Sequence, residues 1–131
     1  MKKTFKCEKL IRDNLPNLLS AMKIDLTLKP LNDEEYFKAL IAKFFEEIQE
    51  VKEAKNKEER CEELADIVEI VRAFAKQLSI SFEDIIQLAD KKALHKGGFE
   101  NRVYCTGIAI DEDNPRIEYY RSKSGEYPEV S

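Results

Sequence analysis

The chain has 131 residues, of which 37% are charged, and its formal net charge is −4. This length suggests one domain with a core of its own, and the presence of only four glycines and four prolines favours long helices over a many-stranded β protein. The three cysteines stand far apart without a CxxC pair, and the one histidine has no Cys or His partner nearby, so we expect neither a disulfide framework nor a zinc site.

The N-terminal segment predicts a short helix followed by an extended piece. Pro16 opens PNLLSAM, and proline is tolerated in the first turn of a helix. Residues 24–31 (IDLTLKPL) alternate apolar and polar positions and are ended by Pro30, which is typical of a short extended segment. Residues 1–16 lack an unbroken apolar run, and no stretch reaches membrane-spanning length. We therefore expect a cytoplasmic protein with no membrane partner.

Two long helices are predicted in the middle of the chain. Asn32 or Asp33 caps the first, whose apolar residues recur at helical spacing and carry the helix to about Lys55. After a polar break, the second helix begins near Glu58. We expect its buried stripe to consist of residues at helical spacing: Cys61, Leu64, Val68, Val71, Ala75 and Leu78.

A third helix and a weaker β signal follow. Ser81, with Asp84 three residues later, is like a capping box, and Gly97 supplies the C-terminal stop. Two runs rich in strand-forming residues, 101–110 and 116–122, flank the turn-like DEDNP and suggest a β-hairpin.

Together these elements predict an all-α fold, an antiparallel helical bundle with a possible small C-terminal β-hairpin. The helical domain covers residues 1–110, and residues 111–131 form a C-terminal extension with a hairpin strand and a tail. The apolar stripes on the three helices exceed what one thin bundle can bury, which favours association.

Charge is concentrated in the centre of the chain. Residues 46–70 carry ten acidic and four basic side chains, a net charge of −6, so the remainder carries +2. An acidic centre between more basic ends does not suit binding along a nucleic-acid backbone. It does suit a central cation that an anionic ligand bridges to basic groups.

Two acidic pairs lie beside the predicted apolar stripes. With about 100° per residue, Glu47 falls about 60° from the centre of its stripe, and Glu50 lies on the same side. Glu63 and Asp66 form a similar pair on the next helix, and an antiparallel turn would bring the two pairs together. Four converging carboxylates repel one another unless a hard divalent cation binds them, and Mg²⁺ prefers carboxylate oxygens. The alternative is an ordinary solvated acidic surface.

Three motifs resemble one known family. EEIQE (46–50) and EELAD (62–66) are similar to the acidic motifs of the MazG-like, all-α nucleoside triphosphate pyrophosphohydrolases, which include phosphoribosyl-ATP pyrophosphatase and dimeric dUTPases. KLIRDNLP (9–16) resembles the KLVRDKIP signature of one bacterial and phage branch, and KGGFENRVY (96–104) resembles the closing element of that branch. The resemblance covers roughly residues 8–105.

The resemblance implies a homodimer or homotetramer that holds Mg²⁺, or Mn²⁺, on its acidic helices. By position, the metal ligands would be Glu47, Glu50, Glu63 and Asp66. The family cleaves a nucleoside triphosphate between the α- and β-phosphates, giving a monophosphate and pyrophosphate, and its usual targets are non-canonical or surplus nucleotides.

The same resemblance suggests roles for other polar residues. Glu46 or Glu50 could orient or deprotonate the attacking water. Four cationic side chains are candidates for binding the substrate: Arg12, Lys43, Lys92 and Lys96.

Structural alternatives stand beside these roles. Arg12 and Asp13 could form an ion pair that holds the N-terminal segment, and Lys92 and Lys96 could complement the dipole at a helix C-terminus. Asn14 stands where the family branch has lysine, which puts full activity in question.

The competing function is a non-catalytic helical module that binds a nucleotide or a partner through a degenerate site. A helical transcription regulator is disfavoured because the chain lacks a basic recognition helix, so we expect no nucleic-acid polymer as a partner.

Overall fold

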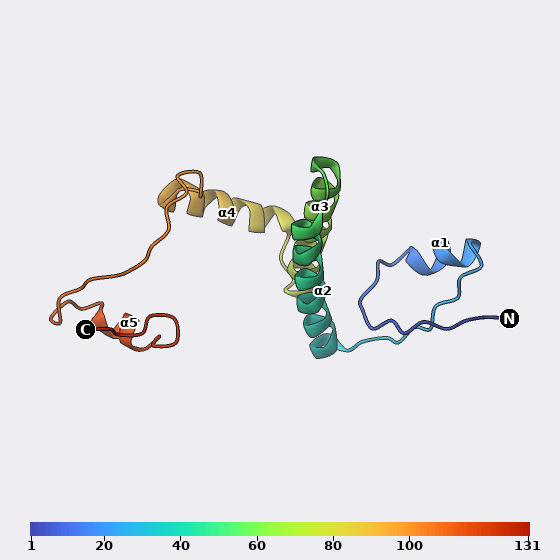
Figure 1. Cartoon of the computed structure of the whole chain (residues 1–131), viewed down its shortest axis with the longest axis horizontal. Helices are drawn as coiled ribbons and strands as arrows, with labels where there is room; N and C mark the ends of the chain where they lie inside the picture. The colour runs from blue at the N-terminus through green and yellow to red at the C-terminus, as the bar shows by residue number, and fades with distance from the viewer. The chain divides into compact units, whose positions relative to one another are not determined.

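A computed structural model describes residues 1–131 and divides them into two units, Met1–His95 and Lys96–Ser131. The chain is helical and contains no strand (Figure 1). Its helices are α1 (Leu15–Ala21), α2 (Asp33–Glu53), α3 (Lys57–Gln77), α4 (Phe82–Lys96) and α5 (Ile117–Arg121). The prediction of an all-α fold is therefore confirmed, while the domain boundary after residue 110 stays a prediction. None of the helices combines the length and apolar character that a bilayer crossing requires.

The helix starts follow the local signals in the sequence. Pro16 lies in the first turn of α1, as predicted. At the start of α2, the side chain of Asn32 accepts the Glu35 backbone N–H at 2.9 Å, and the Glu35 side chain accepts the Asn32 backbone N–H at 3.2 Å. This reciprocal capping box satisfies two N–H groups that the helix itself cannot pair.

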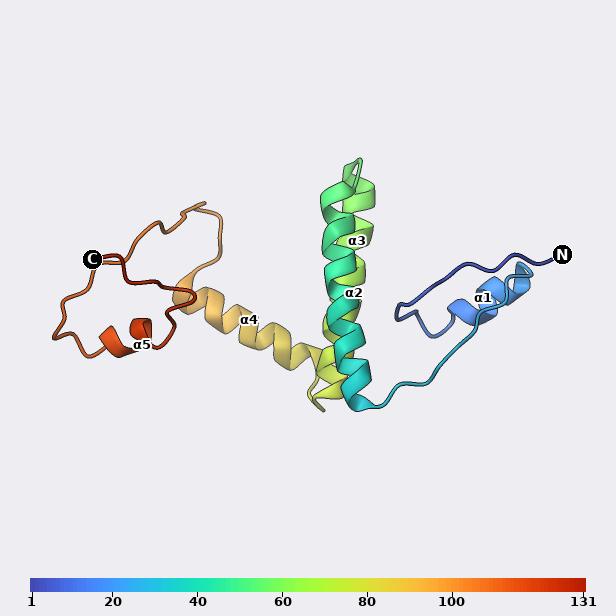
Figure 2. The same ribbon diagram turned by 60° about the horizontal axis from the view of Figure 1, so that its bottom comes forward.

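A short polar turn reverses the chain between α2 and α3. The side chain of Asn56 accepts the Glu59 backbone N–H at 2.8 Å, and the Lys55 backbone N–H donates to the Glu59 carboxylate at 2.9 Å. Arg60 Nε donates to the backbone carbonyl of Val51 at 3.3 Å and ties the two helix ends together. Figure 2 shows α2 and α3 side by side, as Figure 1 does.

The α2–α3 hairpin is the only place where two helices pack against each other. Its buried apolar residues are Leu40, Ile70 and Ala75. The rings of Phe37 and Phe74 meet edge to face at 5.7 Å between centroids. One chain thus forms a two-helix hairpin, and the predicted bundle is not assembled within it.

The face of α3 that meets α2 agrees with the predicted stripe only in part: Ala75 is buried, but other members are exposed. Leu64, Val68 and Leu78 are 49%, 40% and 65% exposed, and Cys61, which the sequence placed in the core, is exposed as well. The face that carries Phe74 meets α2 instead. The predicted stripe does lie along one side of α3, but most of it is exposed in the single chain, and the assignment of Cys61 to the core was wrong.

The third long helix begins and ends as the sequence predicts. Ser81 Oγ accepts the Asp84 backbone N–H at 3.1 Å at the start of α4. After Lys96, Gly97 adopts a φ of +82°, a backbone conformation that glycine tolerates without strain.

The predicted C-terminal β-hairpin is absent, because α5 occupies the second of its expected strands. The side chain of Asn114 accepts the Arg116 backbone N–H at 2.9 Å and forms a turn around Pro115 that leads into the helix. An isolated two-stranded hairpin has little stability of its own, so the strand propensity of the tyrosines does not decide the structure here.

The second unit is held by aromatic and cationic contacts. Tyr120 packs edge to face against Tyr119 and Tyr127, with centroid distances of 5.2 and 5.1 Å. The guanidinium of Arg116 lies 4.8 Å from the centroid of the Tyr119 ring. Arg121 pairs with Glu129 at 3.0 Å and so links α5 to the last residues of the chain.

Candidate metal centre

Glu47 is the one buried charged residue of the chain. It lies on α2 with 4% of its surface exposed, and its Oε2 atom has no hydrogen-bond partner. Glu63, on α3, also has a buried Oε2 atom without a partner. Buried polar atoms are nearly always paired, because leaving one unpaired costs free energy. A shared proton or a bound cation would satisfy these two carboxylate oxygens.

Three carboxylates form the centre of the site. Ligand atoms of Glu47, Glu50 and Glu63 all lie within 4.8 Å of one another. They are drawn from both helices of the hairpin, and the spacing of three residues between Glu47 and Glu50 places both on the same side of α2. We call these three residues the carboxylate cluster.

The pKa of Glu63 and that of Glu47 are both raised within the carboxylate cluster. The pKa of Glu63 is raised to about 8, chiefly because its carboxyl lies against those of Glu47 and Glu50, where a shared proton relieves their repulsion. The pKa of Glu47 is also raised, first because burial disfavours its charged form and further because Glu50 lies close. Without a cation, the cluster therefore retains protons at neutral pH.

The chemistry of the carboxylate cluster fits a hard divalent cation. All its donors are carboxylate oxygens, with no thiol or imidazole among them, which matches the preference of Mg²⁺ or Mn²⁺ and disfavours Zn²⁺. The buried unpartnered oxygens of Glu47 and Glu63 are the atoms that such an ion would satisfy.

Asp66, the fourth predicted ligand, is not part of the carboxylate cluster in this structure. Its Oδ1 atom accepts a hydrogen bond from Arg12 Nη2 at 2.6 Å. Arg12 therefore contacts α3 and not its neighbour Asp13, which makes no ion pair. The contact holds the N-terminal segment against the hairpin, as the structural alternative for Arg12 required, although through a different carboxylate.

The predicted residues Lys43 and Glu46 lie next to the carboxylate cluster. Lys43 Nζ is 3.3 Å from Glu46 Oε1 and 3.6 Å from Glu47 Oε1. Lys9 Nζ approaches the same Glu46 oxygen at 3.4 Å. No role was predicted for Lys9, although it begins the KLIRDNLP motif and stands three residues before Arg12.

Lys92 and Lys96, two other predicted substrate residues, are exposed on α4 and make no ion pair.

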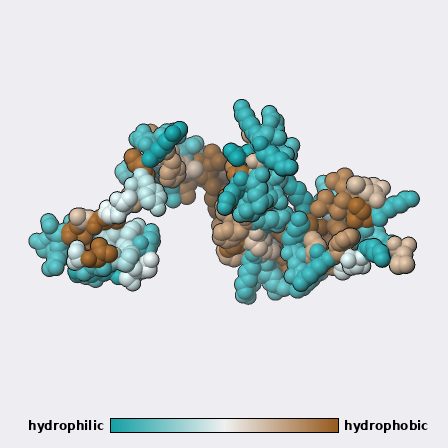
Figure 3. Space-filling model, viewed as in Figure 1, coloured by the Kyte–Doolittle hydropathy of each residue, from teal (hydrophilic) through white to brown (hydrophobic).

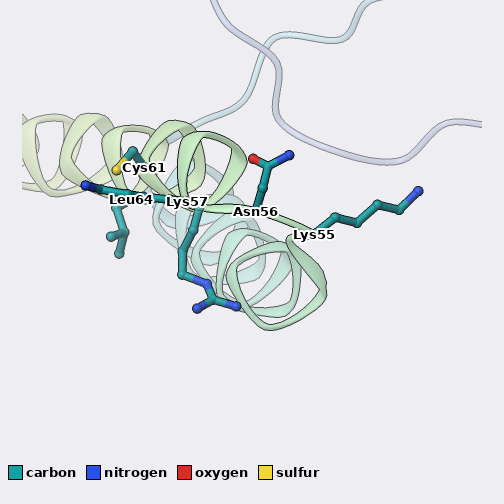
Figure 4. Close-up of a pocket in the computed structure, with 6 residues that line it drawn as sticks. Lys55, Asn56, Lys57, Cys61 and Leu64 are labelled. Carbon is teal, nitrogen blue, oxygen red and sulfur yellow. The ribbon is translucent and has the colours of Figure 1, made fainter.

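A surface hollow lies at the turn between α2 and α3 (Figure 4). Its lining is basic and apolar: Lys55, Asn56, Lys57, Arg60, Cys61 and Leu64. None of the cluster carboxylates lines it, so we do not assign it to the metal centre.

Comparison of the chain with protein-family models, curated proteins and solved structures finds no match.

Proposed function

We propose that the chain is a Mg²⁺-dependent nucleotide pyrophosphohydrolase. It would cleave a nucleoside triphosphate between the α- and β-phosphates to a monophosphate and pyrophosphate, and so remove non-canonical or surplus nucleotides. The observation that carries this proposal is Glu47, a carboxylate that is 4% exposed, lacks a partner for Oε2 and faces Glu50 and Glu63. The resemblance of the three sequence motifs supplies the reaction.

The chain's own residues divide into two groups in this proposal. Glu47, Glu50 and Glu63 would hold the cation, and Asp66 would join them once it leaves Arg12. A bound Mg²⁺ supplies charge neutralisation at phosphate oxygens and lowers the pKa of a coordinated water.

A carboxylate of the same site would accept the proton of the attacking water. The water oxygen would form a bond to the α-phosphorus while the bond from that phosphorus to the oxygen bridging to the β-phosphate breaks. Pyrophosphate then leaves, and one water proton goes to a carboxylate. Glu46 and Glu50 are the candidate bases.

Exposed apolar residues on both helices support a homodimer or homotetramer. On α2, Phe37, Phe45 and Ile48 are 47%, 66% and 44% exposed, and α3 adds the stripe at Leu64 and Val68. Figure 3 shows hydrophobic areas lying open beside hydrophilic ones on the face in view. Such surface is normally buried in an interface, and a second hairpin of the same kind would cover it.

The test is turnover of a panel of canonical and modified nucleoside triphosphates with Mg²⁺, read as release of monophosphate and pyrophosphate. Glu63→Gln should abolish turnover, because the amide is a poor ligand for a hard cation. Glu62→Gln is the matched control, since Glu62 is the exposed neighbour on α3 and lies outside the carboxylate cluster. Equal activity of the two variants, or no turnover of any nucleotide by the unmodified protein, would refute the proposal.

A second candidate is a non-catalytic module that binds a nucleotide or a partner. It is favoured by the Arg12–Asp66 ion pair, which already neutralises one predicted ligand, and by the surface hollow, which none of the cluster carboxylates lines. Calorimetric titration with Mg²⁺ and with Mn²⁺ separates the candidates, because a degenerate site should give no binding heat.

A further inference from the structure

Two cations of the N-terminal segment converge on the hairpin. Lys9 and Arg12 precede α1 and are three residues apart, and we call residues 9–12 the strap. Lys9 contacts Glu46 on α2 at 3.4 Å, and Arg12 contacts Asp66 on α3 at 2.6 Å. The strap therefore contacts one carboxylate on each helix, and these carboxylates flank the cluster in sequence.

Two ammonium groups, those of Lys9 and Lys43, lie beside the carboxylate cluster and share one carboxylate, that of Glu46. Lys9 and Lys43 both approach Oε1 of Glu46, at 3.4 and 3.3 Å, so a single carboxylate serves two ammonium groups. Lys43 has a second, longer contact with Glu47 at 3.6 Å. Either ammonium group can therefore exchange its contact with Glu46 for a contact with a phosphate beside the carboxylate cluster.

The strap contacts are also easily exchanged. The side chains of Lys9 and Arg12 are 49% and 59% exposed, and ion pairs between exposed groups contribute little stability. Both cations can donate charge-assisted hydrogen bonds to phosphate as they do to carboxylate, and the planar guanidinium of Arg12 matches two phosphate oxygens at once.

We propose that Lys9 and Arg12 are the polyphosphate-binding residues of the site, held by Glu46 and Asp66 in the metal-free chain and released to phosphate when Asp66 turns to a divalent cation. This inference rests on the proposed function and adds to it the strap, the role of Lys9 and an order of binding. The site contains five carboxylates, namely the cluster together with Glu46 and Asp66, and only three cations: Lys9, Arg12 and Lys43. Without a metal ion its carboxylates therefore outnumber its cations. A polyphosphate therefore binds after the cation and not before it.

The experiment measures binding and not turnover. Manganese is titrated into the full chain, and inorganic pyrophosphate is then titrated into the chain at saturating Mn²⁺, with the heat of the same titration into Mn²⁺ alone subtracted. The variants are Lys9→Gln, Arg12→Gln and Arg12→Lys. Lys6→Gln is the matched control, because Lys6 lies in the same segment and pairs only with its neighbour Glu8.

We expect Lys9→Gln and Arg12→Gln each to weaken pyrophosphate binding by about tenfold or more, because each removes a charge-assisted hydrogen bond. Manganese affinity should stay unchanged or rise in Arg12→Gln, since Asp66 is then free. Arg12→Lys should keep part of the pyrophosphate affinity, and Lys6→Gln should keep all of it.

Unchanged pyrophosphate affinity in both glutamine variants overturns the strap proposal, as does pyrophosphate binding of equal strength without metal. If either of these results is obtained and the unmodified chain still hydrolyses nucleotides, the proposed function survives and only the strap proposal fails. If the unmodified chain does not bind Mn²⁺, both fail together. Helix content measured by circular dichroism shows whether each variant is folded. If Arg12→Gln does not fold, the charge-conserving Arg12→Lys variant tests the role of Arg12.

Discussion

Divalent-cation binding should depend steeply on pH, because the carboxylate cluster must lose its protons to bind. The pKa of Glu63 is raised to about 8, so the metal-free residue is mostly protonated at pH 6 and half ionised at pH 8. A ligand that must be ionised then makes the apparent affinity rise about fiftyfold between these two pH values. Glu47, whose pKa is also raised, steepens the dependence further.

Calorimetric titration of Mn²⁺ between pH 6 and 8 measures this dependence. Near pH 7, in buffers of different ionisation enthalpy, it should also reveal the release of about one proton or more per ion bound. An affinity that is flat between pH 6 and 8, with no proton released, would refute the reasoning that the three carboxyls share one ion.

The same groups set the sign of the pH dependence of stability without metal. Glu63 ionises near its usual 4.5 when the chain is unfolded but only near 8 when folded. Between these values the folded chain holds a proton that the unfolded chain has lost, so the free energy of unfolding should fall as pH rises. Excess Mg²⁺ should remove most of this fall, and urea midpoints at pH 5 and 8, with chelator or with Mg²⁺, measure both effects.

Three further predictions concern substitutions on the hairpin and at its cap. Glu47→Gln should stabilise the metal-free chain at pH 7.5 by about 1–3 kcal/mol in urea unfolding, because it replaces a buried ionisable carboxyl with a neutral amide of similar size. The substitution Glu62→Gln, at an exposed position, should change the stability little. Leu64→Glu combined with Val68→Glu should shift a dimer or tetramer to monomers in analytical ultracentrifugation, and an unchanged mass would contradict the interface. Asn32→Ala should destabilise the chain by about 1 kcal/mol through loss of the capping box, measured as a lower urea midpoint.

The local elements could be predicted from the sequence because their signals lie within a few residues. Asn32, Ser81 and Gly97 act on backbone groups of their own turn, so the starts and stops of α2 and α4 agree with the prediction. The C-terminal hairpin failed because strand propensity needs neighbouring strands to act, whereas Asn114 and Pro115 act locally.

The choice between two faces of α3 could not be made from periodicity. The apolar residues around Leu64 form the more regular stripe, yet the face of Phe74 meets α2. A hydrophobic stripe indicates that a face is buried but not by which partner, and the stripe at Leu64 stays exposed in a single chain.

The carboxylate cluster was predicted in part. The sequence predicted that an antiparallel turn brings the two acidic pairs together, and ligand atoms of Glu47, Glu50 and Glu63 do lie together. The pairing of Asp66 with Arg12 was beyond reach, because it joins residues 54 positions apart through a segment without regular structure.

The central claim is that Glu47, Glu50 and Glu63 share one divalent cation, and an anomalous difference map from crystals soaked in Mn²⁺ tests it most directly. We expect one strong manganese peak bonded to oxygens of these three residues, and no such peak in crystals of Glu63→Gln. Manganese peaks confined to other carboxylates, with the Oε2 atoms of Glu47 and Glu63 bound to protein or water alone, would contradict the account.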